Sequence, residues 1–397
     1  MKTKHILFGI VLLAFTTINA QEIKTSKFGK GLFNLVGQDS SWTMKIGFRF
    51  QLLGTSTWTE NAPSETNFLV RRSRLKFSGF AFSPKLRYKV ELGLSNRDMS
   101  GASEFTRNSP RYIMDARIRW NFYKNFELWV GQGKLPGNRE RVISSGNLQL
   151  VNRSRLNSRF NIDRDMGAML THKFNINPNF LVKEILSFSQ GEGRNVTQGN
   201  QGGFQYVGRI ELFPFGEFIS RGDYKGSDLK REQTPKLSLA GGMEFNNDAV
   251  RTRSNRGSYM FIDDGADLYK TNVNTVFIDG MFKYKGYSFM FEYADRKADN
   301  PIAKNSDGTE TGDIVQVGNG LNLMSGYLFP SNWEITGRYT DINMDTISGS
   351  NSDDMYTLGV SKFFAGHKLK VQSDLSYMEV HGGSNEILFR LQMDIHF

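Results

Sequence analysis

Basic side chains recur at alternate positions along three neighbouring stretches of the chain. Because side chains two residues apart in a β-strand point to the same face, each set would line one side of a strand. A row of such groups offers an anion successive sites of similar strength, so that it binds without being trapped. The residues are Arg72, Arg74 and Lys76 in the first stretch, Arg87 and Lys89 in the second, and Arg117 and Arg119 in the third.

A second basic set lies on the thirty-residue stretch 135–164 and the residue before it. Connections of this length without regular structure usually have a function. If this one folds into the interior of a barrel, its charges set the electric field at the narrowest point. The basic residues are Lys134, Arg139, Arg141, Arg153, Arg155, Arg159 and Arg164.

Residue patterns typical of catalysis or of bound cofactors are absent from the sequence. Its histidines are scattered, and no His-Glu-x-x-His pair, Gly-x-Ser-x-Gly turn or Walker A loop occurs. The lack of cysteine excludes thiol catalysis and disulfides. Two acidic loops, 263–267 and 341–345, could bind Ca²⁺, but neither completes a known calcium loop. We therefore expect no enzyme, no cofactor and no metal.

The positive charge is regional. A net charge of +10 would ordinarily raise nucleic acid as a partner. Residues 70–175 contain 21 Lys/Arg against 8 Asp/Glu, so this region is more basic than the whole chain. The charge lies on strand-patterned sequence rather than on a basic tail, which argues against nucleic acid.

Apolar and polar residues alternate in sixteen stretches, most of about ten residues. A tilted strand of roughly 9–11 residues crosses a membrane, with one face in hydrocarbon and one in water. Arginine or lysine on the lipid face costs about 2–4 kcal/mol at the midplane, so the basic rows must face inward. The predicted strands are 42–52, 68–82, 85–95, 112–122, 126–134, 165–174, 180–189, 203–212, 236–245, 272–284, 287–294, 313–328, 333–340, 355–364, 367–379 and 387–397.

Successive connections alternate between short and long, as the periplasmic and external ends of an outer-membrane barrel require. One connection departs from this pattern, because 213–235 is long on the short-turn side. It predicts an elaborated turn or an unrecognised hairpin. The long external stretches are 53–67, 96–111, 135–164, 190–202, 246–271, 295–312 and 341–354.

Both ends of the chain indicate export to an outer membrane. Residues 1–20 have a basic start, an apolar core and a polar end, which predicts a signal peptide cleaved after Ala20. The last predicted strand ends at Phe397 and resembles the C-terminal signature by which the barrel-assembly machinery handles bacterial barrels. Residues 21–41 form a short segment of undefined structure, and 42–397 the barrel.

A soluble β-sandwich or β-propeller would also show many alternating strands. However, no blade-length repeat is visible, and neither fold explains the terminal signals. The predicted fold class is therefore all-β: a transmembrane antiparallel β-barrel of sixteen strands with long external loops and short periplasmic turns.

Several motifs in a fixed order resemble the phosphate-selective porin O and P family over roughly residues 40–397. The likeness implies a homotrimeric porin in the outer membrane of a Gram-negative bacterium of Bacteroidetes type, with arginines along the lumen and lysines at the constriction. Many lysines expected at a phosphate constriction are arginines or absent here. The motifs are Leu69-Val-Arg-Arg-Ser-Arg-Leu-Lys-Phe-Ser-Gly79, Tyr88-Lys-Val-Glu-Leu92, Trp129-Val-Gly-Gln-Gly-Lys-Leu135, Ser189-Gln-Gly-Glu-Gly-Arg194 and Gly208-Arg-Ile-Glu-Leu-Phe-Pro-Phe-Gly216.

Together these features predict passive diffusion of small anions, with phosphate or polyphosphate suggested by the resemblance. Porin walls of any selectivity carry some arginines opposite acidic residues, but here the nearby acids are few, Glu91 and Asp115 among them. The alternatives are a general, oligosaccharide or peptide diffusion channel, and a non-transport barrel such as an adhesin or a barrel enzyme.

Overall fold

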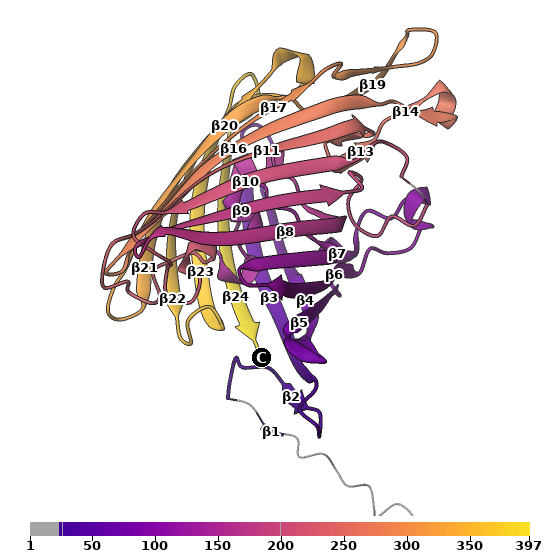
Figure 1. Cartoon of the computed structure of the whole chain (residues 1–397). Coiled ribbons are helices and arrows are strands. Elements are labelled where there is room, and N and C mark those ends of the chain that lie inside the picture. The colour runs from indigo at the N-terminus through magenta and orange to yellow at the C-terminus, as the bar shows by residue number, and fades with distance from the viewer. Residues whose placement is uncertain (1–23, 26, 199) are drawn as a thin grey trace, which may run out of the picture.

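Sixteen antiparallel strands close into a barrel (Figure 1). The computed structural model describes residues 24–25, 27–198 and 200–397. Closure follows because the last strand, β24 (Glu386–His396), pairs along its length with the first strand of the barrel, β3 (Thr43–Thr59). A closed sheet leaves no backbone edge unpaired, which a membrane requires. The predicted fold class is confirmed.

The barrel strands lie in chain order, and each pairs with the next. Within the described residues, no helix has the length and apolar character needed to cross a membrane. The strands are β3 (Thr43–Thr59), β4 (Glu65–Ala81), β5 (Ser83–Gly93), β6 (Ile113–Tyr123), β7 (Phe126–Lys134), β8 (Arg164–Asn177), β9 (Phe180–Ser189), β10 (Gln205–Phe213), β11 (Lys236–Ala249), β16 (Thr271–Tyr284), β17 (Tyr287–Ala298), β20 (Gly318–Leu328), β21 (Trp333–Met344), β22 (Asp353–Phe363), β23 (Leu369–Val380) and β24 (Glu386–His396).

The remaining elements are short and belong to the connections or to the N-terminal segment. They are β1 (Lys24–Thr25), β2 (Phe33–Val36), α2 (Asn96–Met99), η1 (Glu104–Thr106), α3 (Arg139–Val142), η2 (Ser145–Asn147), α4 (Arg155–Arg159), η3 (Gly222–Tyr224), β12 (Arg251–Arg253), β13 (Arg256–Tyr259), β14 (Phe261–Ile262), η4 (Asp263–Gly265), β15 (Asp267–Leu268), β18 (Ile302–Lys304), β19 (Glu310–Ile314) and η5 (Thr346–Ser348).

Each of the sixteen predicted stretches corresponds to a barrel strand, although several ends differ by up to four residues and two regions differ by more. The predicted loop 53–67 is mostly strand, because β3 runs to Thr59 and β4 begins at Glu65. Its threonines favour extended backbone, although polar residues lie on both faces and hide the alternation. The predicted strand 313–328 begins only at Gly318, because β19 pairs with β18 in a separate hairpin.

The strands present an apolar face outward and a polar face inward. Ile210 on β10 is 52% exposed, whereas its neighbours Arg209 and Glu211 are 3% and 0% exposed. The same alternation holds in β24, where Leu391 is exposed and Arg390 is buried. The outward face can therefore meet hydrocarbon, while the inward polar groups must find partners inside the barrel.

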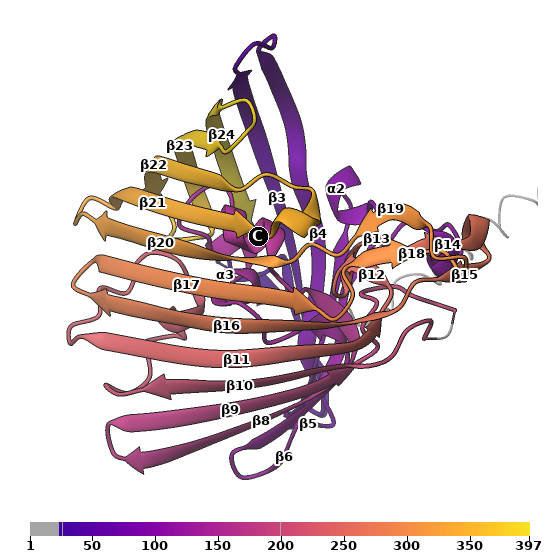
Figure 2. The ribbon, with the colours of Figure 1, turned by 90° about the horizontal axis from the view of Figure 1, so that it is seen from above.

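The long connection between β7 and β8 folds into the barrel instead of projecting from its rim. Inside the ring of strands in Figure 2, α3 is visible. Arg139 forms an ion pair with Asp279 on β16, with 2.6 Å between Nε and Oδ1. Gln149 donates to Glu334 on β21 at 2.8 Å. The sequence left the position of this connection open, and these contacts place it across the lumen against the far wall.

The connection between β10 and β11, residues 214–235, also enters the lumen, from the opposite end. It contains η3 and no hairpin, so it is an elaborated turn. Nζ of Lys283 on β16 donates to the carbonyls of Gly222, Lys225 and Ser227 at 2.6–2.9 Å. The turn is thereby held inside the barrel.

An apolar cluster joins the two inward segments to the wall that they cover. Ile143 and Leu150 of the β7–β8 connection pack with Phe218 of the turn, and with Met281 and Met324 of the wall. Burying such side chains is worth about 1.5–3 kcal/mol each. This side of the lumen is therefore filled, and the open space lies on the other side.

The N-terminal segment extends the sheet at the end that carries the short turns. There β2 pairs with the start of β3, and β1 pairs with β2. The ring of Phe28 packs edge-on against Phe397, with 5.9 Å between centroids. The predicted signal peptide, residues 1–20, lies outside the described residues.

Candidate functional site

An outer cavity of about 740 Å³ opens between the β7–β8 connection and the arginine-bearing strands. Among the described residues that line it are fourteen arginines and Lys134, against three acidic residues, Asp98, Asp163 and Glu386. This imbalance gives the cavity a strongly positive potential, because low-dielectric walls focus the field of charges inside them.

Two adjacent arginines of β4 both reach the outer cavity, although strict alternation would send one of them outward. The register between β3 and β4 shifts at Gln51, and this bulge places both Arg71 and Arg72 on the inner side, each 6% exposed. Arg72 donates to Gln51 at 2.7 Å, and Arg71 donates to Asn152. Sequence reasoning missed Arg71, but adjacent arginines in a lipid-facing strand signal a bulge, because one would otherwise lie in hydrocarbon.

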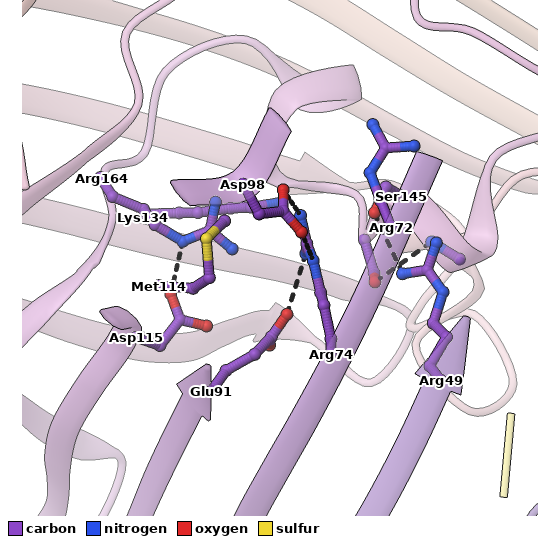
Figure 3. Close-up of polar contacts among 12 residues, drawn as sticks. Arg49, Arg72, Arg74, Glu91, Asp98, Met114, Asp115, Lys134, Ser145 and Arg164 are labelled. Atoms are coloured by element: carbon purple, nitrogen blue, oxygen red, sulfur yellow. Dashed lines mark hydrogen bonds and ion pairs between the residues drawn. The ribbon is translucent and has the colours of Figure 1, made fainter. Parts of the chain in front are cut away.

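Arg74 lines this cavity, and Figure 3 shows it between the carboxylates of Asp98 and Glu91. Its Nε lies 2.7 Å from Oδ2 of Asp98 and its Nη1 lies 2.9 Å from Oε1 of Glu91. Across from it, Arg164 pairs with Asp115 at 2.7 Å. These carboxylates hold the guanidinium groups in fixed positions, and charge-assisted pairs of this kind are short and strongly oriented.

An inner cavity of about 620 Å³ lies beyond this point, toward the short turns. Arg74, Lys134 and Arg164 line both cavities, so they form the boundary between them. Lys134 donates to the carbonyls of Arg141, Val142 and Ile143 at 2.6, 3.2 and 3.1 Å. These contacts hold the ammonium group in place, but the carbonyls do not neutralise its charge. The boundary is therefore a ring of basic groups supplied by β4, β7 and β8.

The arginines of the β7–β8 connection differ in whether they face the cavity. Arg153 lines it and donates to the carbonyls of Glu140 and Ile143 at 2.8 and 2.7 Å. Burial, followed by repulsion from neighbouring arginines such as Arg74, lowers the pKa of Arg153 to about 9. Arg141 also lines the cavity, and it pairs with Asp163.

Three other predicted residues of this connection bind the covered wall. Arg139 is fully buried and donates to Asp279, to Ser238 and to a backbone carbonyl, so it lies away from both cavities. Arg155 pairs with Asp353 on β22 at 2.6 Å and lines the cavity edge. Arg159 reaches the same carboxylate at 3.8 Å and does not line the outer cavity.

The five predicted wall residues other than Arg72 and Arg74 also divide into those that line a cavity and those that do not. Three of them line the inner cavity: Lys89, which pairs with Asp115 and Glu91, Arg117, and Arg119, which pairs with Glu127. The other two line neither cavity. Lys76 lies opposite Glu91 in the strand register, and the exposed Arg87 donates to the carbonyl of Pro84 near a short turn.

Several arginines that line the outer cavity come from external loops and were not predicted. Arg253 donates to the carbonyl of Ser158 at 2.9 Å, and Arg256 donates to Asn161 at 2.5 Å, so the β12–β13 hairpin joins the β7–β8 connection. The repeated arginines of 251–256 were the available signal, although nothing in the sequence shows which loops meet. The loop residues are Arg97, Arg111, Arg194, Arg251, Arg253 and Arg256.

Comparison with known proteins agrees with this architecture. A family model described as phosphate-selective porin O and P matches residues 45–386. The comparison with curated proteins finds no match.

Solved porins share the fold at low sequence identity. The anion-selective porin from Comamonas acidovorans is 11% identical, with a TM-score of 0.53, over 90% of this chain and 100% of that one. OmpF of Salmonella typhi, in complex with daunomycin, is 10% identical, with a TM-score of 0.53, over 91% and 100%. OmpT of Vibrio cholerae, in its trimer form, is 13% identical, with a TM-score of 0.51, over 88% and 99%.

Proposed function

The chain belongs to the phosphate-selective porin O and P family, and we propose that this outer-membrane porin admits small anions, with inorganic phosphate and short polyphosphates among them. The observation that carries the proposal is the outer cavity, where basic side chains far outnumber acidic ones. Such a vestibule concentrates anions and repels cations before either reaches the boundary ring.

The arrangement of partners explains how anions could pass without being trapped. Arg71 and Arg72 donate to amide oxygens, and Arg153 donates to carbonyls, so their charges stay available to a solute. Arg74 and Arg164 are held by carboxylates, which moderates their attraction. A path of moderate, similar sites favours conduction over tight binding.

The assembly of the porin follows as a second part of the proposal. A homotrimer is supported by the family and by OmpT of Vibrio cholerae, which was solved in a trimer form. Residues 1–20 would direct export, and the barrel-assembly machinery would engage the last strand, which ends beside Phe397. Outer-membrane lipid would then cover the exposed apolar face.

Reversal potentials of single channels in a KCl gradient test the selectivity. Replacing the four wall residues Arg72, Arg74, Arg117 and Arg119 by Glu should turn an anion-preferring pore toward cations. The wild-type preference should weaken at high salt, because the screening length falls to about 3 Å at 1 M. The loop variant Arg153→Glu/Arg155→Glu shows whether the β7–β8 connection contributes.

An unchanged chloride-to-potassium permeability ratio in both variants would contradict the proposal. In that case the general diffusion channel becomes the better interpretation, and liposome-swelling rates with sugars and peptides of increasing size would measure its cutoff.

A further inference from the structure

The two cavities on either side of the boundary ring differ in their apolar content. The outer cavity is bounded mostly by charged and polar side chains, with Met114, Met355, Met378 and Leu388 as its large apolar members and no aromatic residue among those described. The inner cavity combines basic groups with apolar and aromatic ones, and both inward-folded segments contribute apolar residues to its lining. Its large apolar and aromatic side chains include Trp129, Met169, Ile185, Phe213, Phe218 and Tyr224.

Trp129 is held rigidly on the lumen face of β7. Its Nε1 donates to Glu127, and the guanidinium of Arg117 lies 3.9 Å from the indole centroid. Glycines stand beside it on the same face, and a Cβ on Gly133 would lie 3.0 Å from Cδ of Arg117. The bare backbone therefore gives Arg117 room to lie along the indole ring, in a cation–π arrangement.

Arg117 is the basic group beside this indole that keeps its charge available. Its neighbours Arg119 and Lys183 pair with Glu127 and Glu211, whereas Arg117 forms no ion pair within the described part of the chain. A half-buried guanidinium without a carboxylate partner attracts a carboxylate or sulfonate group, which it can bind through two parallel hydrogen bonds.

We propose that the inner cavity binds amphipathic organic anions, with a carboxylate or sulfonate on a flat aromatic body, more strongly than short aliphatic anions. The acid group would pair with Arg117, while the ring would pack over Trp129 and the sulfur-bearing side chain of Met169, which are direct partners in the register of β7 and β8. Aromatic and sulfur–aromatic contacts favour such a body beyond its buried area. The inference rests on the proposed anion pathway and adds a substrate class to it.

The test is the block of chloride current through single channels of the full-length porin in planar bilayers. We expect benzoate to interrupt the current with an apparent Kd about fivefold lower than that of propanoate. Neutral benzyl alcohol should not block. Trp129→Leu should abolish the advantage of benzoate, and Trp129→Phe should retain most of it. Trp120→Leu, on the outward face of β6, is the matched control and should leave it intact.

Equal block by benzoate and propanoate would overturn the inference, as would an advantage that survives in both Trp129→Leu and Met169→Gln. Reversal potentials on the same channels separate this outcome from a failure of the proposed function. A wild-type channel that shows no anion preference but is blocked better by benzoate would refute the anion porin. A wild-type channel that prefers anions but is blocked equally by benzoate and propanoate would refute the aromatic site alone.

Discussion

The wall from β4 to β8 and the wall from β16 to β24 both turn polar residues inward, but most of the second wall is covered. Only its β22–β24 end reaches the outer cavity, through Met355, Met378, Glu386, Leu388 and Arg390. On the covered wall, Asp279 pairs with Arg139, and Glu334 accepts from Gln149. On the open wall, Arg72 and Arg117 line the cavities. An inward position is therefore necessary for contact with a solute but not sufficient, because the inward segments decide which wall stays exposed.

The comparison of the two walls also explains how the basic excess of residues 70–175 can dominate the lining of the outer cavity. Acidic residues of the covered wall, such as Asp279 and Asp353, are paired with arginines of the β7–β8 connection. The connection thus neutralises the acids opposite the basic wall, and a solute meets mainly basic groups. Removing the connection would expose those acids and should reduce the anion preference that we propose.

The largest effect should come from Arg139, which holds the connection to the covered wall. Arg139→Met removes one of the two arginines that pair with Asp279 and leaves Arg209 as the remaining partner. The cost should therefore stay below the about 3–5 kcal/mol of a buried charge left unpaired. We expect a lower free energy of unfolding and a larger, noisier conductance, measured by denaturant titration and single-channel recording. The exposed Arg87→Met is the control. Wild-type values for Arg139→Met would show that the apolar cluster alone holds the connection.

A smaller effect is expected from Arg153, which lines the outer cavity. Arg153→Gln should lower the chloride-to-potassium permeability ratio about twofold with little change in stability. Arg159→Gln is the matched control, since Arg159 does not line the outer cavity. Equal ratios in the two variants would contradict this assignment.

A still smaller effect on the permeability ratio tests the bulge in β4. Arg71→Gln should reduce the permeability ratio about as much as Arg72→Gln does, because both side chains line the outer cavity. Val70→Thr, at an exposed position of the same strand, should leave the ratio unchanged. A ratio that responds to Arg72→Gln alone would mean that Arg71 faces outward, as strict alternation predicts.

The smallest effect concerns the inward turn. Burial raises the pKa of Asp223, although Arg139 opposes the shift. The folded protein therefore holds this proton more tightly, and the associated stability, complete below about pH 3.9, is lost as the pH rises through the folded pKa. Asp223→Asn removes that loss, so it should raise the unfolding temperature by about 1–2 °C at pH 7. The difference should vanish near pH 4, and a constant difference across this range would exclude the titration of Asp223.

Much of the barrel could be predicted from local pattern. In stretches such as 85–95 and 387–397 the alternation of apolar and polar residues determines both the strand and its two faces, because side chains of a strand alternate with a period of two. The pattern fails at Arg71, where the inserted residue of a bulge shifts the period, and at 54–59, where both faces are polar.

The sequence by itself determined a sixteen-strand barrel with a basic wall, since those properties depend on residues close together in the chain. Only the tertiary structure decided that the β7–β8 connection lies inside the lumen, that Arg139 anchors it, and that Arg153 lines the outer cavity. The ion pair of Arg139 with Asp279 joins residues 140 positions apart. A local sequence pattern cannot predict such a partner, because closure of the barrel brings the two residues into contact.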